Sequence, residues 1–370
     1  MKLKKELSLL EPSVIRAYTA LANEIPGCIK LTIGEPDFDT PEEIKAAAVK
    51  ALAEGMTHYA PNQGLPELRQ AVAEVETQRG YSCTPAQIMI TMGASGALYT
   101  ALTGILEPGD QVIIPQPAFP VYESITLAAG AEVVPMPLQD FQVADVEQYV
   151  TEKTRAIVLN SPNNPSGTVL NRESLERVKK AVLGKDIWVI CDNVYNQLAE
   201  GPVYDLSLDP QMKDQVMVCQ SFSKPYAMTG WRVGYLAAPA DAISRLLLLN
   251  AMQIAAVPTF AQQACITALK TDISYMQQAY NQRRALVCSR LEKMGISCPK
   301  PEGAFYVFAD IRKFGLTSDA FCRRMIAEAK VAAVPGSCFG SEGFVRFSCA
   351  CSTQELEEAL DRIEKFTALL

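Results

Sequence analysis

Two serines, one lysine and one arginine lie close together in a short segment that begins at Ser221 and ends at Arg232. The hydroxyls of Ser221 and Ser223 can each donate a hydrogen bond, and the guanidinium of Arg232 can bind two oxygens of one anion. These are the groups that hold a phosphate. Lys224 stands between a serine and a proline, so it does not lie on the face of a regular helix, and its amine can reach a phosphate bound beside it.

An amine beside a bound phosphate suggests a particular kind of ligand. Lys224 would be held against a carbonyl of a phosphorylated molecule, which is the arrangement that a Schiff base to pyridoxal phosphate requires. The run from Gln215 to Gln220 in front of the segment is short, apolar and rich in valine, which predicts a buried strand. The reactive segment therefore begins where a strand ends.

The same residues also match a different chemistry. Ser221 to Lys224 formally read Ser-x-x-Lys, the nucleophile pattern of penicillin-binding proteins and β-lactamases, but its Ser-Asp-Asn and Lys-Thr-Gly companions are missing. The stretch from Gly93 to Ala97 falls one glycine short of a nucleophile elbow. The single histidine, His58, precedes both serine candidates, whereas an α/β-hydrolase needs it after the serine. A serine acyl-transferase or hydrolase is therefore a remote alternative.

The elements that position this chemistry alternate between strands and helices. Seven short apolar strands are predicted, and most of them are joined by helical patterns. Continuously apolar strands joined by helices are typical of a mostly parallel sheet with helices on both faces, so we expect an α/β fold. The predicted strands are Ile88–Thr91, Gln111–Pro115, Glu132–Met136, Ala156–Asn160, Ile187–Cys191, Val216–Cys219 and Val233–Ala237.

The last third of the chain changes character and predicts a smaller α+β part. A chain of 370 residues is too long for one ordinary core. We expect a large domain over residues 42–275 and a small domain formed by residues 1–41 and 276–370. The predicted helices of the last third are 241–250, 260–294, 318–330 and 352–369, and its predicted strands are 304–309, 331–334 and 344–348.

Composition narrows the classes of function. The formal net charge of -7 argues against nucleic acid as the main partner. No apolar stretch approaches the ~20 residues needed to cross a bilayer, and the start lacks the apolar core of a signal peptide. The eleven cysteines include no Cys-x-x-Cys pair, and one histidine offers little for a zinc site. We therefore expect a cytoplasmic protein with reduced thiols, no bound metal and no membrane partner.

Polar residues follow four of the predicted strands at the point where each ends. Ala94 and Ser95 follow one strand, the amide-rich turn 160–167 follows another, and Asp192 and Tyr195 follow a third, with the lysine segment after the fourth. Ligands of open α/β sheets bind outside the carboxyl ends of the strands, so we expect these groups to meet on one ligand. Taken singly, each could be an ordinary cap, turn or packing residue. Asp192 needs a partner in any case: a protonated ring nitrogen, an arginine or a helix N-terminus.

These motifs together resemble the class I/II aminotransferases of fold type I, which depend on pyridoxal phosphate. The resemblance covers nearly the whole chain, from about Leu31 to the C-terminus. The segment from Ser221 to Gly234 follows the lysine-site pattern of the family. The turn from Ser161 to Gly167 matches its Asn-Pro-x-Asn-Pro-Thr-Gly turn with two replacements. The stretch 301–348 looks most like bacterial aspartate and N-acetyl-LL-diaminopimelate aminotransferases.

The resemblance assigns roles around the cofactor. It implies that Lys224 forms the Schiff base and then moves a proton between the substrate Cα and the cofactor C4′. Asp192 would pair with the ring nitrogen, and Asn164 and Tyr195 would hydrogen-bond the phenolic oxygen. Phe119 would stack on the ring. The residues implied to hold the phosphate are Ala94, Ser95, Ser221, Ser223 and Arg232.

The resemblance also implies the substrate and the assembly. Arg346 would bind the substrate α-carboxylate through two hydrogen bonds, and the backbone of Gly34 would contact the same group. Tyr59 would reach the phosphate of a neighbouring subunit, which implies a homodimer with shared active sites. The reaction would move an amino group between an L-amino acid and a 2-oxo acid. Glutamate and 2-oxoglutarate would be one pair, with aspartate, an aromatic amino acid or N-acetyl-diaminopimelate as the candidate partner.

Two further alternatives keep the fold but change the function. Carbon–sulfur β-lyases use the same cofactor and lysine, and the sequence leaves open whether a β-substituent departs from the substrate. A transcriptional regulator that reuses the domain would carry a DNA-binding domain in front, but only about thirty residues precede Gly34. We therefore expect transamination, with β-elimination as the main alternative.

Overall fold

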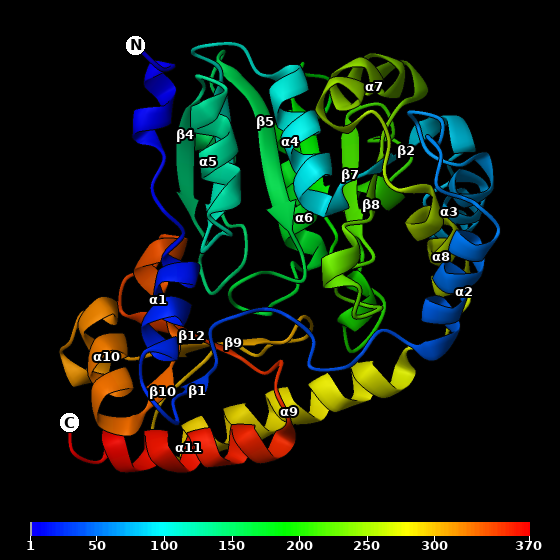
Figure 1. Ribbon diagram of the computed structural model, residues 1–370. Helices are drawn as coiled ribbons and strands as arrows, with labels where there is room; N and C mark the ends of the chain where they lie inside the picture. Colours follow the sequence, from blue (N-terminus) through cyan, green and yellow to red (C-terminus); the bar gives the residue numbers. More distant parts are fainter. Residues whose placement is uncertain (1) are drawn as a thin grey trace.

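A seven-stranded sheet forms the centre of the protein, of which the computed structural model describes residues 2–370. The strand order is β2-β8-β7-β6-β5-β3-β4 (Figure 1). Strand β8 is antiparallel to both neighbours, and every other pair is parallel, so the predicted mostly parallel sheet is confirmed. The strands are β2 (Ile88–Thr91), β3 (Gln111–Gln116), β4 (Glu132–Pro137), β5 (Thr154–Asn160), β6 (Trp188–Asp192), β7 (Val216–Ser221) and β8 (Gly234–Ala237).

Helices cover both faces of this sheet because its strands are apolar on both sides. In β7, Val216 and Val218 pack into one core, while Met217 and Cys219 pack into the other. The helices on the first face are α2 (Glu42–Ala53), α3 (Pro66–Arg79), α6 (Arg172–Val182) and α8 (Thr259–Ala268); those on the second are α4 (Gly93–Ile105), α5 (Val121–Ala128) and α7 (Ala240–Ile254).

A further core, below the sheet in Figure 1, joins α1 and the segment after it to the last third of the chain. A short parallel pair joins β1 to β10, and β11, β12 and β9 form a separate antiparallel sheet. This packing agrees with the expected small domain, whose residue limits stay a prediction. Its elements are α1 (Val14–Asn23), β1 (Ile29–Lys30), α9 (Ser274–Lys293), β9 (Tyr306–Asp310), α10 (Ser318–Arg324), β10 (Val331–Ala332), β11 (Val334–Pro335), β12 (Phe344–Ser348) and α11 (Thr353–Thr367).

Two predicted helices of the last third are wrong in their extent. The single helix predicted over 260–294 is two helices, because Asp272 accepts a hydrogen bond from the backbone of Ser274 and starts α9 anew. The apolar spacing continues across that turn, so periodicity does not reveal it. The helix predicted over 318–330 leaves α-geometry after Arg324 and continues as one π-helical turn.

The topology brings the functional segments to one edge of the sheet. Strands β5, β6 and β7 run in the same direction, so their carboxyl ends lie together, and β12 and the N-terminal segment line the space beyond them. Within residues 2–370, no helix is both long enough and apolar enough to cross a membrane.

Candidate active site

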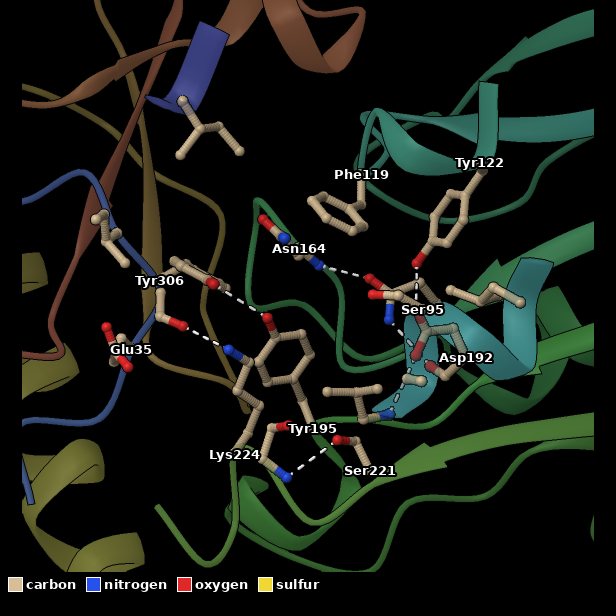
Figure 2. Close-up of a pocket in the computed structure, with 18 of the residues that line it drawn as sticks. Glu35, Ser95, Phe119, Tyr122, Asn164, Asp192, Tyr195, Ser221, Lys224 and Tyr306 are labelled. Carbon is tan, nitrogen blue, oxygen red and sulfur yellow. Dashed lines mark hydrogen bonds between the residues drawn. The ribbon is translucent and has the colours of Figure 1, made fainter. Parts of the chain in front are cut away.

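A cavity of about 470 Å³ lies beyond the carboxyl ends of β5, β6 and β7 (Figure 2). Its lining comes from the sheet, from the segment that follows α1, and from β9 and β12. All predicted site residues except one line this cavity: Gly34, Ala94, Ser95, Phe119, Asn164, Asp192, Tyr195, Ser221, Ser223, Lys224, Arg232 and Arg346.

The N-terminus of α4 and Arg232 form an anion site in this cavity. Gly93 has a φ of 65°, and a Cβ there would lie 2.6 Å from Nη2 of Arg232, so glycine lets the guanidinium approach the helix start. The first N–H groups of a helix lack intrahelical partners and favour a negative charge. Arg232 donates to the carbonyl of Thr229 at 2.9 Å and forms no ion pair within residues 2–370. This arrangement suits a phosphate.

Lys224 lies in the same cavity with an amine that is easily deprotonated. Its Nζ donates a hydrogen bond to the carbonyl oxygen of Gly34 at 2.6 Å. Burial lowers the pKa of Lys224 to about 8, although the nearby carboxylate of Glu35 acts in the opposite direction. Roughly a tenth of the amine is therefore neutral, and so nucleophilic, at pH 7, far more than for a lysine of ordinary pKa.

Asp192 is a buried carboxylate without a cationic partner. Its Oδ2 accepts a hydrogen bond from the Tyr122 hydroxyl at 2.6 Å, and its Oδ1 accepts one from the backbone N–H of Val194 at 3.3 Å (Figure 2). Burial raises the pKa of Asp192 to about 6 despite these two bonds. Of the three partners expected from the sequence, the described chain supplies neither an arginine nor a helix N-terminus, which leaves a cationic ring nitrogen of a ligand.

Arg346 is a buried cation that, like Asp192, has no ion-pair partner within residues 2–370. Its side chain is 1% exposed; Nη1 donates to Asn164 Oδ1 at 2.8 Å and Nη2 donates to the carbonyl of Thr32. Its Nε has no hydrogen-bond partner among the described residues. A buried guanidinium with a free donor and no acidic neighbour is a site for an incoming carboxylate.

Tyr59 is the predicted site residue that lies elsewhere. Its side chain is 90% exposed and borders a different hollow, formed with residues 57–60 and 256–260. Its expected role concerns a second subunit, so that role stays a prediction.

Four further residues of the cavity carry chemistry that the sequence did not single out. Tyr122, which lies in α5, donates a hydrogen bond to Asp192. The hydroxyl oxygen of Tyr306 lies 3.0 Å from the hydroxyl oxygen of Tyr195. Arg16 and Glu35 line the side formed by the N-terminal segment. Arg16, Glu35 and Tyr306 follow no strand of the main sheet, so the strand-end argument does not apply to them. Tyr122 lies at the start of the helix that follows β3, three residues after Phe119, and this position is the signal that could have found it.

The geometry argues against serine nucleophile chemistry. A Ser-x-x-Lys nucleophile needs a hydrogen bond between the lysine and the serine hydroxyl. Here Lys224 Nζ donates to Gly34, whereas Ser221 Oγ accepts from the backbone N–H of Ser223 at 3.0 Å. Ser221 belongs to the polar lining of the cavity.

The fold and this cavity define an α/β enzyme that binds a phosphorylated carbonyl cofactor beside a lysine. The chain belongs to the aminotransferase class I and II family, whose sequence model matches residues 26–363.

Known relatives and structures agree over the whole chain. An aspartate aminotransferase of Pyrococcus abyssi is 41% identical over 381 residues, which cover 99% of this chain and 98% of the relative. The aromatic-amino-acid aminotransferase 2 of Thermococcus litoralis is also 41% identical, with the same coverage. The structure of the Thermus thermophilus aspartate aminotransferase with maleate has a TM-score of 0.94 at 34% identity and covers 99% of each chain.

These findings confirm the predicted fold, activity and cofactor. The protein is an aminotransferase that depends on pyridoxal phosphate. The cavity fits this cofactor, because within residues 2–370 Arg232 has no anionic partner and Asp192 no cationic one, and the lowered pKa of Lys224 makes its amine easier to deprotonate than an ordinary lysine. The β-lyase alternative finds no support among the relatives described above.

Proposed function

We propose that this aminotransferase exchanges amino groups between glutamate and a second acidic amino acid, aspartate first among them. The observation that carries the proposal is a pair of arginines, Arg346 and Arg16. Both line the cavity, and neither forms an ion pair within residues 2–370. Two such cations suit a substrate with two carboxylates. Aromatic amino acids and N-acetyl-diaminopimelate are the weaker candidates.

The cofactor is held by residues at the strand ends. When bound, pyridoxal phosphate supplies a carbonyl that condenses with amines and a ring that withdraws electrons from the substrate Cα. Asp192 would keep the ring nitrogen protonated, because a cation there would stabilise the buried carboxylate. Tyr195 and the Nδ2 of Asn164 would donate to the phenolic oxygen, and Phe119 would pack on the ring. The phosphate would be held by Ala94, Ser95, Ser221, Ser223 and Arg232.

Lys224 is the catalytic base and acid. With substrate and cofactor bound, its Nζ would accept the proton that leaves the substrate Cα and would donate it at the cofactor C4′. A pKa of about 8 places the amine near the pH at which both directions of this transfer are efficient. The Gly34 carbonyl accepts a hydrogen bond from Nζ at 2.6 Å, and Nζ would have to leave this carbonyl to condense with an aldehyde.

The substrate is bound by the two ends of the chain. Arg346 binds the α-carboxylate through two hydrogen bonds, and the Gly34 backbone contacts the same group. Arg16, exposed in the first turn of α1, reaches the side-chain carboxylate. Because these residues lie outside the proposed large domain, 42–275, substrate binding draws the small domain toward the sheet and excludes water.

The assembly and the compartment complete the proposal. We infer a homodimer in which Tyr59, 90% exposed here, reaches the phosphate of the partner subunit's cofactor. All eleven cysteines are free thiols, which favours a reducing compartment, and we infer the cytoplasm.

The test of the activity starts from the holoenzyme and single amino acids. Glutamate or aspartate alone should change the visible spectrum and release one 2-oxo acid per bound cofactor. Lys224→Ala protein should lose amino transfer by roughly 10⁴-fold and resist reductive trapping of the cofactor by borohydride. Repeated release of pyruvate and ammonia from cystathionine would show a β-lyase instead.

The test of the substrate class is the Arg16→Gln variant. Loss of a charge-assisted hydrogen bond should lower kcat/KM for aspartate and glutamate roughly tenfold or more and leave kcat/KM for phenylalanine unchanged. Arg177→Gln on the surface of α6 is the matched control, because it removes an arginine outside the cavity. Equal losses for aspartate and phenylalanine would overturn the role of Arg16.

A further inference from the structure

Tyr306 lies between the groups proposed to bind the cofactor and the substrate. It is the first residue of β9 and is 2% exposed. Its hydroxyl oxygen lies 3.0 Å from the hydroxyl oxygen of Tyr195 (Figure 2). The guanidinium carbon of Arg346 lies 4.4 Å from the centre of its ring. The hydroxyl of Tyr306 thus contacts Tyr195, which is proposed to bind the cofactor, and its ring contacts Arg346, which is proposed to bind the substrate.

The Tyr306 hydroxyl also lies against the segment that holds the catalytic lysine. A Cβ at Gly34 would lie 1.7 Å from the Tyr306 hydroxyl oxygen, so only glycine fits there. The carbonyl of the same glycine accepts the hydrogen bond from Lys224. The N-terminal segment, β9 and the loop after β6 therefore meet at the Tyr306 hydroxyl.

The hydroxyl hydrogens of Tyr306 and Tyr195 compete for few acceptors. Each hydroxyl has one hydrogen to donate, and both side chains are buried. Either hydroxyl can donate in the bond between them, and within residues 2–370 neither has another hydrogen-bond partner. One hydroxyl hydrogen is therefore left without a protein acceptor in both directions, which is costly unless a ligand accepts it. If Tyr306 donates, the free hydrogen belongs to Tyr195, which is the residue proposed to donate to the phenolic oxygen of the cofactor.

We propose that Tyr306 is a positioning residue that donates its hydroxyl hydrogen to Tyr195 and thereby directs the Tyr195 hydroxyl to the phenolic oxygen of the cofactor. This inference rests on the proposed role of Tyr195. A hydroxyl that accepts one hydrogen bond becomes a stronger donor in the next, so the pair stabilises the phenolic oxygen in its anionic form. The ring of Tyr306 separately supports the guanidinium of Arg346.

The Tyr306→Phe variant tests this by removing the hydroxyl and keeping the ring. The pH midpoint of the visible absorbance of the holoenzyme should rise by roughly half a pH unit, because the anionic oxygen is less stabilised. The KM for glutamate should change little, because the ring still supports Arg346. Tyr306→Leu should additionally raise KM.

A double-mutant cycle shows whether the effect passes through Tyr195. In the Tyr195→Phe background, which already lacks the donor to the cofactor, adding Tyr306→Phe should cause no further shift of the midpoint. Tyr280→Phe is the matched control, because Tyr280 has a buried hydroxyl without a partner and its ring packs on Phe305 beside Tyr306. This control should leave the midpoint unchanged.

Two outcomes would overturn the inference. An unchanged midpoint in Tyr306→Phe protein that binds cofactor and melts normally would reduce Tyr306 to a packing residue. An equal shift in the Tyr195→Phe background would show that Tyr306 acts independently of Tyr195. If the wild-type protein formed no reducible bond between Lys224 and the cofactor, the proposed function itself would fail, which is a separate result.

Discussion

Arg79 and Arg346 are both largely enclosed by protein, but they differ in their neighbours. Arg79, at the end of α3, binds Glu76 at 2.7 Å and Asp205 at 2.6 Å. Burial opposes its charge, yet the two carboxylates raise the pKa of Arg79 above its ordinary value. Arg346 is buried more completely, and within residues 2–370 its guanidinium donates hydrogen bonds to neutral oxygens and lies over the rings of Tyr306 and Phe339.

The difference distinguishes Arg79, whose charge is paired within the fold, from Arg346, whose charge is available to a ligand. The cluster of Glu76, Arg79 and Asp205 is complete without any ligand, because each charged group has a partner of opposite sign. Arg346 and Asp192 are incomplete in this sense, because within residues 2–370 neither pairs with a charge of opposite sign that would offset the free-energy cost of its burial. Incomplete buried charges therefore mark the parts of the cavity that a substrate and a cofactor complete.

The largest effect is expected at the complete cluster. Arg79→Met leaves Glu76 and Asp205 buried without a cation, which should lower the free energy of unfolding by about 3–5 kcal/mol. Urea denaturation measures this loss. Turnover per folded molecule should stay at the wild-type value. Adding Glu76→Gln and Asp205→Asn to Arg79→Met should restore most of the free energy of unfolding. If Arg79→Met lowered turnover without lowering stability, Arg79 would serve the reaction and the contrast with Arg346 would be wrong.

A somewhat smaller effect, on activity alone, is expected at Arg346. Arg346→Gln should lower kcat/KM for glutamate roughly 100-fold, because the α-carboxylate loses its charged partner. The cofactor-free variant should be at least as stable as the wild type, since an unpaired buried cation has been removed. Arg346→Lys should recover only part of the activity. If Arg346→Gln markedly lowered the free energy of unfolding measured in urea, Arg346 would be a residue that stabilises the fold, as Arg79 is.

A third effect concerns the pH dependence of the cofactor-free protein. The pKa of Asp192 is raised from 3.8 to about 6. Between these values the folded chain holds a proton that the unfolded chain has lost, so the free energy of unfolding should fall as pH rises from about 4 to about 6. The contribution is on the order of 3 kcal/mol.

Thermal unfolding from pH 4 to 8 measures this contribution. Asp192→Asn should remove it, so the cofactor-free variant should melt above the wild type at pH 7. Bound cofactor should reverse the order, because the wild-type carboxylate then has its cation. Identical profiles for the two cofactor-free proteins would show that Asp192 is not an incomplete charge.

The sequence predicted the sheet side of the cavity well for a physical reason. Strands that run parallel bring their carboxyl ends to one edge, so Asp192, Tyr195 and Lys224 could be placed together from their position after apolar runs. The resemblance added Arg346 and Gly34. The helix break at Asp272 was missed because one side chain, not the apolar pattern, causes it.

The other side of the cavity depends on contacts between distant segments, which local patterns do not encode. Tyr306 acts through a bond to Tyr195, 111 residues away. Arg16 reaches the cavity only because α1 packs against the last third of the chain. Neither residue follows a strand of the main sheet, so nothing in its sequence neighbourhood distinguished it from a surface or core residue.

The bond between Arg346 and the Thr32 carbonyl joins residues 314 positions apart, and this has a consequence for biosynthesis. The N-terminal segment around Thr32 is translated first, but its side of the proposed active site forms only after β12, near the end of the chain, has been translated. The central sheet, whose strands all lie within residues 88–237, can be complete on the ribosome well before that. A nascent chain that ends before β12 would contain Lys224 and the residues proposed to hold the phosphate, but not Arg346, which is proposed to bind the substrate.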